Sequence, residues 1–293
     1  MKYKFLVIGL GSMGKRRIRC LLELGISKEN IMGFDISEDR CHEVEKLYEI
    51  DTIWIFALPL YEPIIMFVCT PPDKHLEYLQ IASDYKIPCF VEASVCIEGL
   101  KELVKRDDKH LIHPSATMRF DNHIRDIKKF VENSKDIVRF EYKCISYLPD
   151  WHPNEDISEF YVSKRETGAC REMVPFELEW LIWIFGKVKE IKGLVTSTGE
   201  FGEIDDVYNI LVRFESGVIG NITIDIITKA AKGGHREINL YNRDYFTIDR
   251  IRSTEQMYID EIKHFLNALK GNLYHYSLKE DIEVLELLKK IEE

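Results

Sequence analysis

The sequence lacks any apolar run near the roughly 20 residues that a membrane-spanning helix needs, so we expect no transmembrane segment. Nothing in it resembles a secretory signal, because the apolar residues after Lys4 lead directly into a glycine-rich turn. Positive charge is in deficit: 40 Lys and Arg residues stand against 50 Asp and Glu residues, a formal net charge of -10. This balance argues against nucleic acid or an anionic membrane as the main partner.

The sequence also lacks closely spaced pairs of cysteines. The seven cysteines are odd in number and scattered, and none forms a Cys-x-x-Cys motif. We therefore expect reduced, buried thiols and a cytoplasmic location. No group of His, Cys and acidic residues has the spacing of metal ligands, so we predict no metal site. An apolar content of 45% in 293 residues is ample for one large or two medium globular domains.

The first residues carry the most informative pattern. Residues 2–9 predict a buried strand, a glycine-rich turn follows, and residues 15–24 predict a helix. Gly9 suits the tight turn, Gly11 lets a pyrophosphate approach the backbone, and Gly14 lets the helix pack close to the strand. The free N–H groups at the helix N-terminus favour phosphate. The predicted dinucleotide-binding residues of this turn are Gly9, Gly11, Ser12, Met13 and Gly14.

A second apolar strand, predicted over residues 31–34, ends at Asp35. This is about twenty residues after Gly14, where the acid that binds the ribose hydroxyls belongs. Without this strand and acid, the glycines alone would fit a turn that binds nothing. A carboxylate at this position repels a 2′-phosphate, so we predict NAD as the cofactor. Arg40 lies nearby in the sequence and would offset the repulsion, which keeps NADP as the alternative.

Strands and helices then alternate. Residues 64–69 predict a strand buried on both faces, residues 75–86 a helix, and residues 89–91 and 111–112 short strands. This alternation predicts an α/β Rossmann domain over residues 1–118, with a doubly wound parallel sheet. Ligands of such sheets bind beyond the C-terminal ends of the strands. The further cofactor-binding candidates at these ends are Thr70, Pro71, His75 and Glu92.

The pattern changes in the second half. A predicted helix over residues 167–185 is followed by five predicted strands between residues 188 and 249. Runs of successive strands predict an α+β domain over residues 119–293 with a large open, mostly antiparallel sheet. Residues 147–166 form a long connection rich in aromatic and charged residues, and connections of this length are often functional. Ser277 and Glu280 form a capping box that opens the last predicted helix.

The sequence resembles the Gfo/Idh/MocA family of NAD(P)-dependent oxidoreductases over its whole length. The similar segments are the glycine turn, Phe67-Val-Cys-Thr-Pro-Pro-Asp-Lys-His75, Val91-Glu-Ala-Ser94, residues 116–120, residues 167–186 and the hairpin at residues 215–221. Residues 147–153 resemble a loop of members from surface-glycan and sialic-acid-type sugar pathways. The resemblance implies oxidation or reduction of a sugar, a nucleotide sugar or a cyclitol. It also implies a C-terminal sheet that forms a homodimer or homotetramer.

Two positions depart from the family pattern. The family's Glu-Lys-Pro motif supplies a Lys to the reacting oxygen, and Ala93 stands there in this sequence. On the later helix the family places an acid and, four residues on, a His; here these positions hold Glu172 and Phe176. Hydride transfer to or from a hydroxyl carbon needs a partner for the proton. The remaining candidates for this role are Glu172, His152 and Tyr161.

Three further residues are candidates for contact with the substrate. Arg171 suits a carboxylate or a phosphate, and Trp151 suits stacking on a sugar face. Arg119 lies in the segment that enters the second domain. Each has an ordinary structural alternative: an ion pair for the two arginines and loop packing for Trp151.

Three functions are compatible with these observations. The first is a nicotinamide-dependent oxidoreductase acting on a sugar or nucleotide sugar. The second is a reductase of the biliverdin-reductase kind, which resembles the family but lacks its usual acid–base residues. The third is a cofactor-binding protein without turnover, which acts as a sensor or assembly partner. The aromatic connection, which retains the character of a ligand-binding segment, favours the first over the third.

Overall fold

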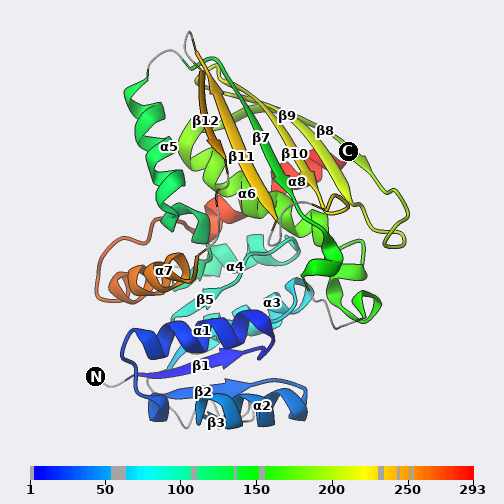
Figure 1. The fold of residues 1–293 in the computed structure, drawn as a ribbon. Coiled ribbons are helices and arrows are strands. Elements are labelled where there is room, and N and C mark those ends of the chain that lie inside the picture. Colours follow the sequence, from blue (N-terminus) through cyan, green and yellow to red (C-terminus); the bar gives the residue numbers. More distant parts are fainter. Residues whose placement is uncertain are drawn as a thin grey trace. The chain divides into compact units, whose positions relative to one another are not determined.

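We describe the protein from a computed structural model (Figure 1). The described residues are 3–53, 64–106, 111–134, 137–151, 156–229, 234–242, 245–249, 251 and 254–293. The chain forms two compact units: unit 1 comprises Met1–Ser115 and Glu255–Ile282, and unit 2 comprises Ala116–Thr254 and Glu283–Glu293. The predicted functional division after residue 118 remains a prediction.

Unit 1 is built on a parallel sheet whose described strands run in the order β3-β2-β1-β4-β5-β6. These strands are β1 Lys4–Ile8, β2 Ile31–Phe34, β3 Asp51–Thr52, β4 Ile64–Val68, β5 Cys89–Val91 and β6 Ile112–Pro114. The strand order reverses between β1 and β4, which is the topological switch point where such sheets bind ligands. The predicted doubly wound α/β architecture is therefore confirmed.

The central strands of this sheet are apolar because both of their faces are covered. Every residue of β2 and β4 is buried, and so is every residue of β1 after Lys4. In the described parts of the chain, helices connect β1 to β2, β2 to β3, β4 to β5 and β5 to β6, as parallel pairing requires. They are α1 Ser12–Glu23, α2 Glu38–Tyr48, α3 His75–Tyr85 and α4 Leu100–Arg106, with the short 3-10 helices η1 Lys28–Asn30 and η3 Pro72–Lys74.

A helix from late in the chain completes the core of unit 1. This helix, α7 Glu255–Ala268, places the ring of Phe265 5.5 Å from the rings of both Phe67 and Phe90. Phe67 lies on β4 and Phe90 on β5, so Phe265 packs on the centre of the parallel sheet. This aromatic contact explains why residues 255–282 belong to the compact unit of the first strands.

The last helix, α8 Leu278–Glu292, begins with the predicted capping box. The Ser277 backbone N–H donates to Glu280 Oε2 over 2.8 Å, and the Glu280 N–H donates to Ser277 Oγ over 3.2 Å. These reciprocal bonds satisfy two backbone donors that the helix geometry would otherwise leave unpaired. The capping-box prediction is confirmed.

Unit 2 contains a second sheet, whose described strands run in the order β12-β11-β7-β10-β9-β8. The strands are β7 Arg139–Ile145, β8 Val188–Thr196, β9 Val207–Phe214, β10 Ile219–Asp225, β11 His235–Tyr241 and β12 Tyr245–Asp249. Only β7 and β10 pair in parallel among these, and the other pairs are antiparallel. The predicted α+β domain with a mostly antiparallel sheet is therefore confirmed.

One face of this second sheet is buried, and the burial alternates along the strands. On β9 the side chains of Tyr208, Ile210, Val212 and Phe214 are buried, and the residues between them are exposed. The long helix α6 Ala169–Phe185 covers the inward face, where the ring of Phe185 stacks on Phe140 at 4.4 Å. Unit 2 also contains the helices α5 Asn122–Asn133 and η4 Thr117–Phe120.

The predicted long connection consists of short 3-10 helices where it is described. These are η5 Leu148–Asp150, η6 Ile157–Glu159 and η7 Tyr161–Ser163. Asp156 caps η6 by accepting a bond from the Ser158 N–H over 2.9 Å. His152, which we predict as a proton-transfer candidate, lies outside the described residues.

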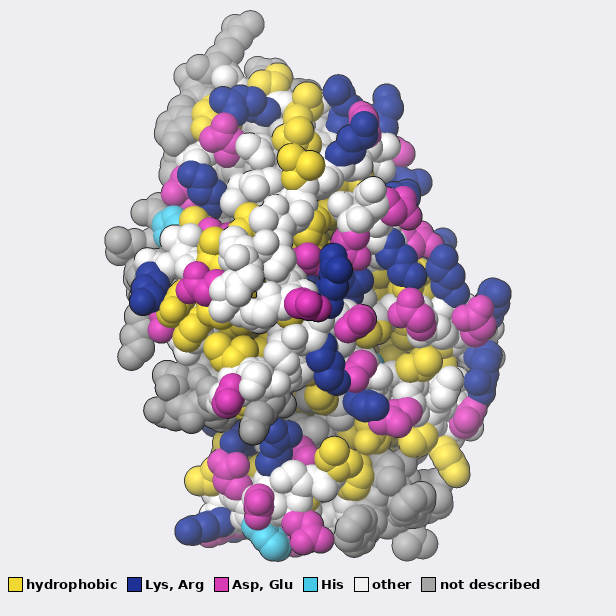
Figure 2. All heavy atoms as spheres, turned by 90° about the vertical axis from the view of Figure 1, so that its right-hand side faces the viewer, with side chains coloured by type: hydrophobic (Ala, Val, Ile, Leu, Met, Phe, Trp, Pro, Cys, Tyr) yellow, Lys and Arg dark blue, Asp and Glu magenta, His cyan; other side chains and the backbone are white. Residues whose placement is uncertain are grey.

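Within the described ranges, no helix combines the length and the apolar character needed to cross a membrane. Figure 2 shows one face of the molecule, on which basic and acidic side chains are interspersed with small hydrophobic areas. This face therefore has mixed charge.

Candidate functional site

The glycine turn lies at the switch point of the parallel sheet. Gly9 has a φ of +86°, and a Cβ there would lie 2.7 Å from the Cys69 carbonyl and the Thr70 nitrogen. A Cβ on Gly14 would lie 1.9 Å from the Gly9 carbonyl oxygen, so only glycine lets α1 approach the turn this closely. At Gly11, by contrast, no atom of the described chain lies within 4 Å of an added Cβ. The turn thus has two tightly packed glycines and one that faces open space.

The N-terminus of α1 lies on this open side. Gly11 is the N-cap residue, and no side chain caps the helix there in the described part of the structure. Ser12 is exposed and Met13 is half-buried. The first N–H groups of a helix need partners from outside it, and the helix dipole makes their end positive. Helix N-termini with this geometry are suited to a phosphate or pyrophosphate.

Asp35 follows β2 and connects it to the turn. Its Oδ2 accepts a bond from the Leu10 N–H over 2.7 Å, and its Oδ1 accepts one from the Ser37 N–H over 2.9 Å. Arg40 Nη1 lies 3.7 Å from Oδ2. Asp35 is therefore placed beside the turn, as the sequence predicts, and it also holds the backbone of the turn in position.

Thr70, Pro71 and His75 follow the end of β4. Burial lowers the pKa of His75, which favours the neutral ring. His75 Nε2 lies 2.8 Å from the Thr70 carbonyl oxygen. A carbonyl only accepts, so Nε2 carries the proton and His75 braces the segment. The Thr70 hydroxyl is buried and has no hydrogen-bond partner within the described ranges, whereas Pro71 is half-buried.

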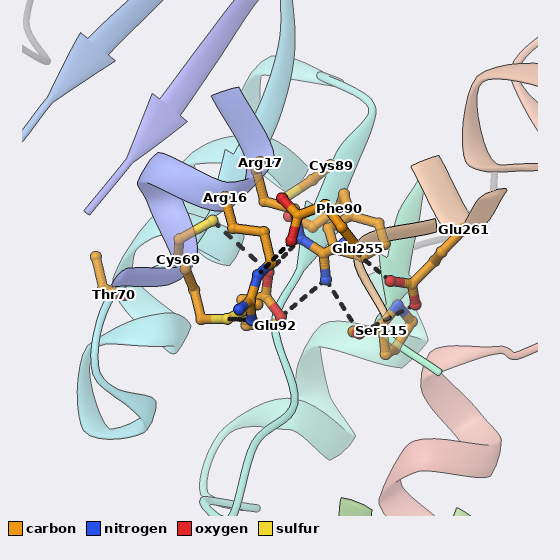
Figure 3. Close-up of polar contacts among 12 residues, drawn as sticks. Arg16, Arg17, Cys69, Thr70, Cys89, Phe90, Glu92, Ser115, Glu255 and Glu261 are labelled. Atoms are coloured by element: carbon orange, nitrogen blue, oxygen red, sulfur yellow. Dashed lines mark hydrogen bonds and ion pairs between the residues drawn. The ribbon is translucent and has the colours of Figure 1, made fainter. Parts of the chain in front are cut away.

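Glu92, which follows β5, belongs to a buried charge cluster centred on Arg17 of α1 (Figure 3). The Arg17 side chain is fully buried, and its Nε lies 2.5 Å from Glu92 Oε1. Its Nη1 lies 2.9 Å from Glu261 Oε2 on α7, and its Nη2 donates to Ser115 Oγ over 3.4 Å. The cluster therefore fastens the first helix to the ends of two strands and to α7.

Charge compensation explains how these groups tolerate burial. Burial alone lowers the pKa of Arg17, but the carboxylates of Glu92 and Glu261 outweigh it and hold this pKa well above the ordinary value. Burial, together with the Glu92 carboxylate, raises the pKa of the neighbouring Cys69 thiol, so this thiol stays protonated.

Prediction from the sequence missed Arg17. Its signal was an arginine among the apolar residues on the buried face of the first helix.

In unit 2, the structure brings together two of the predicted proton-transfer residues. Tyr161 on η7 donates its hydroxyl to Glu172 Oε1 over 3.1 Å. Glu172 lies in the first turn of α6 and Phe176 lies one turn later, so both side chains project from the same face of the helix. Tyr161, Glu172 and Phe176 are all half-buried.

A second buried charge lies on the sheet-facing side of α6. Glu177 is fully buried and accepts bonds from four donors: Tyr142 Oη at 2.6 Å, Arg236 Nε at 2.8 Å, Trp180 Nε1 at 2.9 Å and Cys144 Sγ at 3.4 Å. The guanidinium carbon of Arg236 lies 5.9 Å from the centre of the Phe176 ring. Prediction from the sequence missed this cluster. Its signal was an acidic residue within the otherwise apolar run of residues 173–185.

The three predicted substrate residues make structural contacts. Arg119 is buried, and its Nε donates to Glu179 Oε2 over 2.7 Å. Arg171 Nε donates to Glu292 Oε1 over 2.6 Å, and the half-buried Trp151 donates its indole N–H to Ser146. Their predicted substrate roles remain predictions. Within the described ranges, no group of three or more His, Cys, Asp or Glu side chains is arranged to hold a metal ion.

The family comparison matches part of the chain. Residues 133–243 match the model described as the GFO/IDH/MocA C-terminal domain. This match confirms the predicted resemblance for that part of the chain. The resemblance to one subgroup remains a prediction. No curated protein matches the sequence.

Solved structures match along almost the whole chain. Myo-inositol 2-dehydrogenase from Lactobacillus plantarum has a TM-score of 0.83 at 17% identity, covering 98% of this chain and 95% of that chain. The WlbA dehydrogenase from Bordetella pertussis, in complex with NADH and UDP-GlcNAcA, has a TM-score of 0.83 at 16% identity, covering 100% and 96%. GenD2 from gentamicin A biosynthesis, in complex with NAD, has a TM-score of 0.84 at 12% identity, covering 99% and 93%. At these identities the likeness shows the fold.

Proposed function

We propose that the protein is an NAD-dependent oxidoreductase of the GFO/IDH/MocA type that acts on a sugar or a nucleotide sugar. The observation that carries the proposal is the glycine turn at the switch point, with its open side at Gly11. Among the structural neighbours described above are a myo-inositol 2-dehydrogenase and a dehydrogenase in complex with NADH and the nucleotide sugar UDP-GlcNAcA, which supports the substrate class.

The residues of unit 1 fit the cofactor in three respects. The open side of Gly11 admits a pyrophosphate, and the uncapped start of α1 supplies N–H donors to it. The buried Thr70 hydroxyl, without a partner in the described part of the chain, is available to a ligand at the end of β4. We therefore assign cofactor binding to Gly9, Gly11, Ser12, Met13, Gly14, Asp35, Thr70, Pro71, His75 and Glu92. When bound, the nicotinamide supplies hydride chemistry.

The choice between NAD and NADP depends on Asp35 and Arg40. The Asp35 carboxylate would repel a 2′-phosphate, and Arg40, at 3.7 Å from it, would attract one. Calorimetry should give tighter binding of NADH than of NADPH by the wild-type protein. Arg40→Ala should weaken NADPH further and leave NADH nearly unchanged, because the Arg40 side chain is 47% exposed. Tighter binding of NADPH by the wild type would contradict the assignment.

The protein must also exchange a proton with the reacting hydroxyl. The Tyr161–Glu172 pair is the best candidate, because the Tyr161 hydroxyl on η7 donates to Glu172 on α6 and both side chains are half-buried. Glu172 would hold or release the proton, and Tyr161 would orient the carboxylate. His152 remains a candidate from the sequence. The substrate would be positioned by Arg119, Trp151 or Arg171.

Reduced nicotinamide formation with a panel of sugars and nucleotide sugars tests the proposal directly. Turnover with a tetrapyrrole alone would favour the biliverdin-reductase-like function. Binding of NADH without turnover on either panel would favour the non-catalytic function, which Ala93 and Phe176 support because they replace the family's Lys and His.

We further propose that the protein is a cytoplasmic homodimer or homotetramer that pairs through the outer face of the second sheet. Leu194, Leu211 and Ile219 lie on this face and are 78%, 60% and 41% exposed. The inward Ile222, Ile224 and Ile226 are buried in the core. A monomer mass by light scattering at micromolar concentration would contradict this assembly, and Leu211→Glu should dissociate it.

A further inference from the structure

Arg236 lies on β11 and is held by a buried ion pair. Its register partner is Cys144 on β7, and both side chains reach Glu177 on α6. The bond to Glu177 uses the Nε of Arg236, which lies on the inner edge of the guanidinium. Because Glu177 is itself fixed by the Tyr142 hydroxyl and the Trp180 indole, the plane of this guanidinium has little rotational freedom.

The outer edge of the same guanidinium is unused. Neither Nη1 nor Nη2 of Arg236 has a hydrogen-bond partner within the described ranges, and the side chain is 16% exposed. Burial lowers the pKa of Arg236, but Cys144 and Glu177 outweigh it, so this pKa lies well above its ordinary value and the group is charged. Nearly buried N–H donors normally find partners, so a permanently charged edge without one is suited to a ligand.

The position of this edge relates it to the proposed chemistry. The Arg236 guanidinium lies over the half-buried ring of Phe176, and Phe176 shares a helix face with Glu172. We propose that Arg236 is a specificity-determining residue that binds a carboxylate on the sugar substrate through Nη1 and Nη2. This inference deepens the proposed function, because it names an acidic sugar as the substrate class of that site.

A carboxylate fits better than a phosphate for two reasons. The two Nη groups form a planar fork that matches the two oxygens of one carboxylate. The local charge also favours a ligand with a single negative charge. The Glu177 carboxylate is already paired with Arg236, and the Glu172 carboxyl group lies on the adjacent helix face. A phosphate dianion would leave more negative charge without compensation.

Binding measurements with matched ligands test the inference independently of turnover. The probes are glucuronate, glucose and glucose 6-phosphate, titrated by calorimetry into the full protein with and without NADH. We expect the wild type to bind glucuronate at least about tenfold more tightly than glucose, the scale of one charge-assisted contact, and more tightly than glucose 6-phosphate.

Two variants separate recognition from folding. Arg236→Lys keeps the charge beside Glu177 but removes the planar fork, and it should lose most of the preference for glucuronate. The double variant Arg236→Met, Glu177→Gln removes both buried charges together and should abolish the preference. Arg106→Met is the control, because Arg106 lies on α4 of unit 1, pairs with Asp84, and is 54% exposed.

Chemical modification gives a measurement that needs no variant. Phenylglyoxal modifies exposed arginines, and mass spectrometry of the treated wild type should show Arg236 protected by glucuronate but not by glucose. The inference is overturned if glucuronate does not bind at millimolar concentration, if both variants keep its preference, or if it does not protect Arg236. If no sugar is turned over but these binding results hold, the proposed oxidoreductase function fails while the carboxylate site stands.

Discussion

Arg17 and Glu92 form a buried two-point ion pair, with Nε 2.5 Å from Oε1 and Nη2 3.0 Å from Oε2. The pair connects the helix after the glycine turn to the end of β5. By fixing the first helix, this pair keeps the N–H donors of the turn in place, and it would support the proposed cofactor binding without contacting a phosphate. Removing one partner of such a buried pair strongly lowers the free energy of unfolding, because it leaves the other charge buried without compensation.

Replacing Arg17 therefore tests the cluster. Arg17→Met leaves the carboxylates of Glu92 and Glu261 without their buried cation, and we expect a loss of about 3–5 kcal/mol in the free energy of unfolding. Arg19→Met is the control, because Arg19 is 45% exposed in its pair with Glu255, and exposed pairs contribute about 1 kcal/mol or less. Urea unfolding followed by circular dichroism measures both, and equal losses would show that the buried cluster has no special role.

The glycine turn predicts a separation of binding from folding. Gly11→Val adds a side chain on the open side, so the protein should keep its unfolding midpoint but lose detectable NADH binding in calorimetry. Gly14→Ala is the informative comparison, because its Cβ would lie 1.9 Å from the Gly9 carbonyl oxygen and should lower the unfolding midpoint as well. Retained NADH binding by Gly11→Val would mean that the turn has only a structural role.

Much of the fold follows from local patterns in the sequence. The continuous apolar run at residues 64–69 predicts a fully covered strand, and β4 is buried along its whole length. The alternating residues of β9 predict one buried face, and the structure has it. These predictions hold because the spacing of apolar residues along a single helix or strand indicates which of its faces are buried.

The contacts that organise the two candidate sites are not local. Arg17 meets Glu261 across 244 positions of sequence, and Arg236 meets Glu177 across 59. Periodicity carries no information about such partners, so sequence reasoning placed the glycine turn but missed both buried cations. The strand β3 was also missed, because two residues are too few to show a period.

Asp281 predicts a specific dependence of stability on pH. Burial raises its pKa to about 7, although the Tyr276 hydroxyl, which donates to Oδ1 over 3.0 Å, lowers it in part. Below about pH 4 the carboxyl is protonated in both states. As the pH rises from about 4 to 7, only the unfolded chain releases the proton, so the stability falls by roughly 4 kcal/mol and then levels off.

Asp281→Asn removes this titration and keeps an acceptor for Tyr276. We expect its free energy of unfolding to exceed that of the wild type at pH 8, with a smaller difference at pH 5. Asp126→Asn is the control, because the Asp126 side chain is 67% exposed. Parallel curves for wild type and Asp281→Asn between pH 5 and 8 would show that Asp281 does not titrate in this range.

The last prediction concerns the proton. If Glu172 exchanges it with the substrate, Glu172→Gln should lower turnover at least about a hundredfold, near 3 kcal/mol of barrier, because proton-transfer groups contribute about 10²–10⁴-fold. NADH affinity should stay nearly unchanged, because the residues proposed to bind it belong to unit 1. Tyr161→Phe removes only the hydroxyl that donates to Glu172 over 3.1 Å, and it should cause a smaller loss and shift the pH profile of turnover.

A greater loss of turnover with His152→Ala than with Glu172→Gln would assign the main proton-transfer role to His152 instead of Glu172. Ala93→Lys combined with Phe176→His restores the family's residues, and a gain of sugar oxidation only in that variant would show that the wild-type chain binds the cofactor without using it.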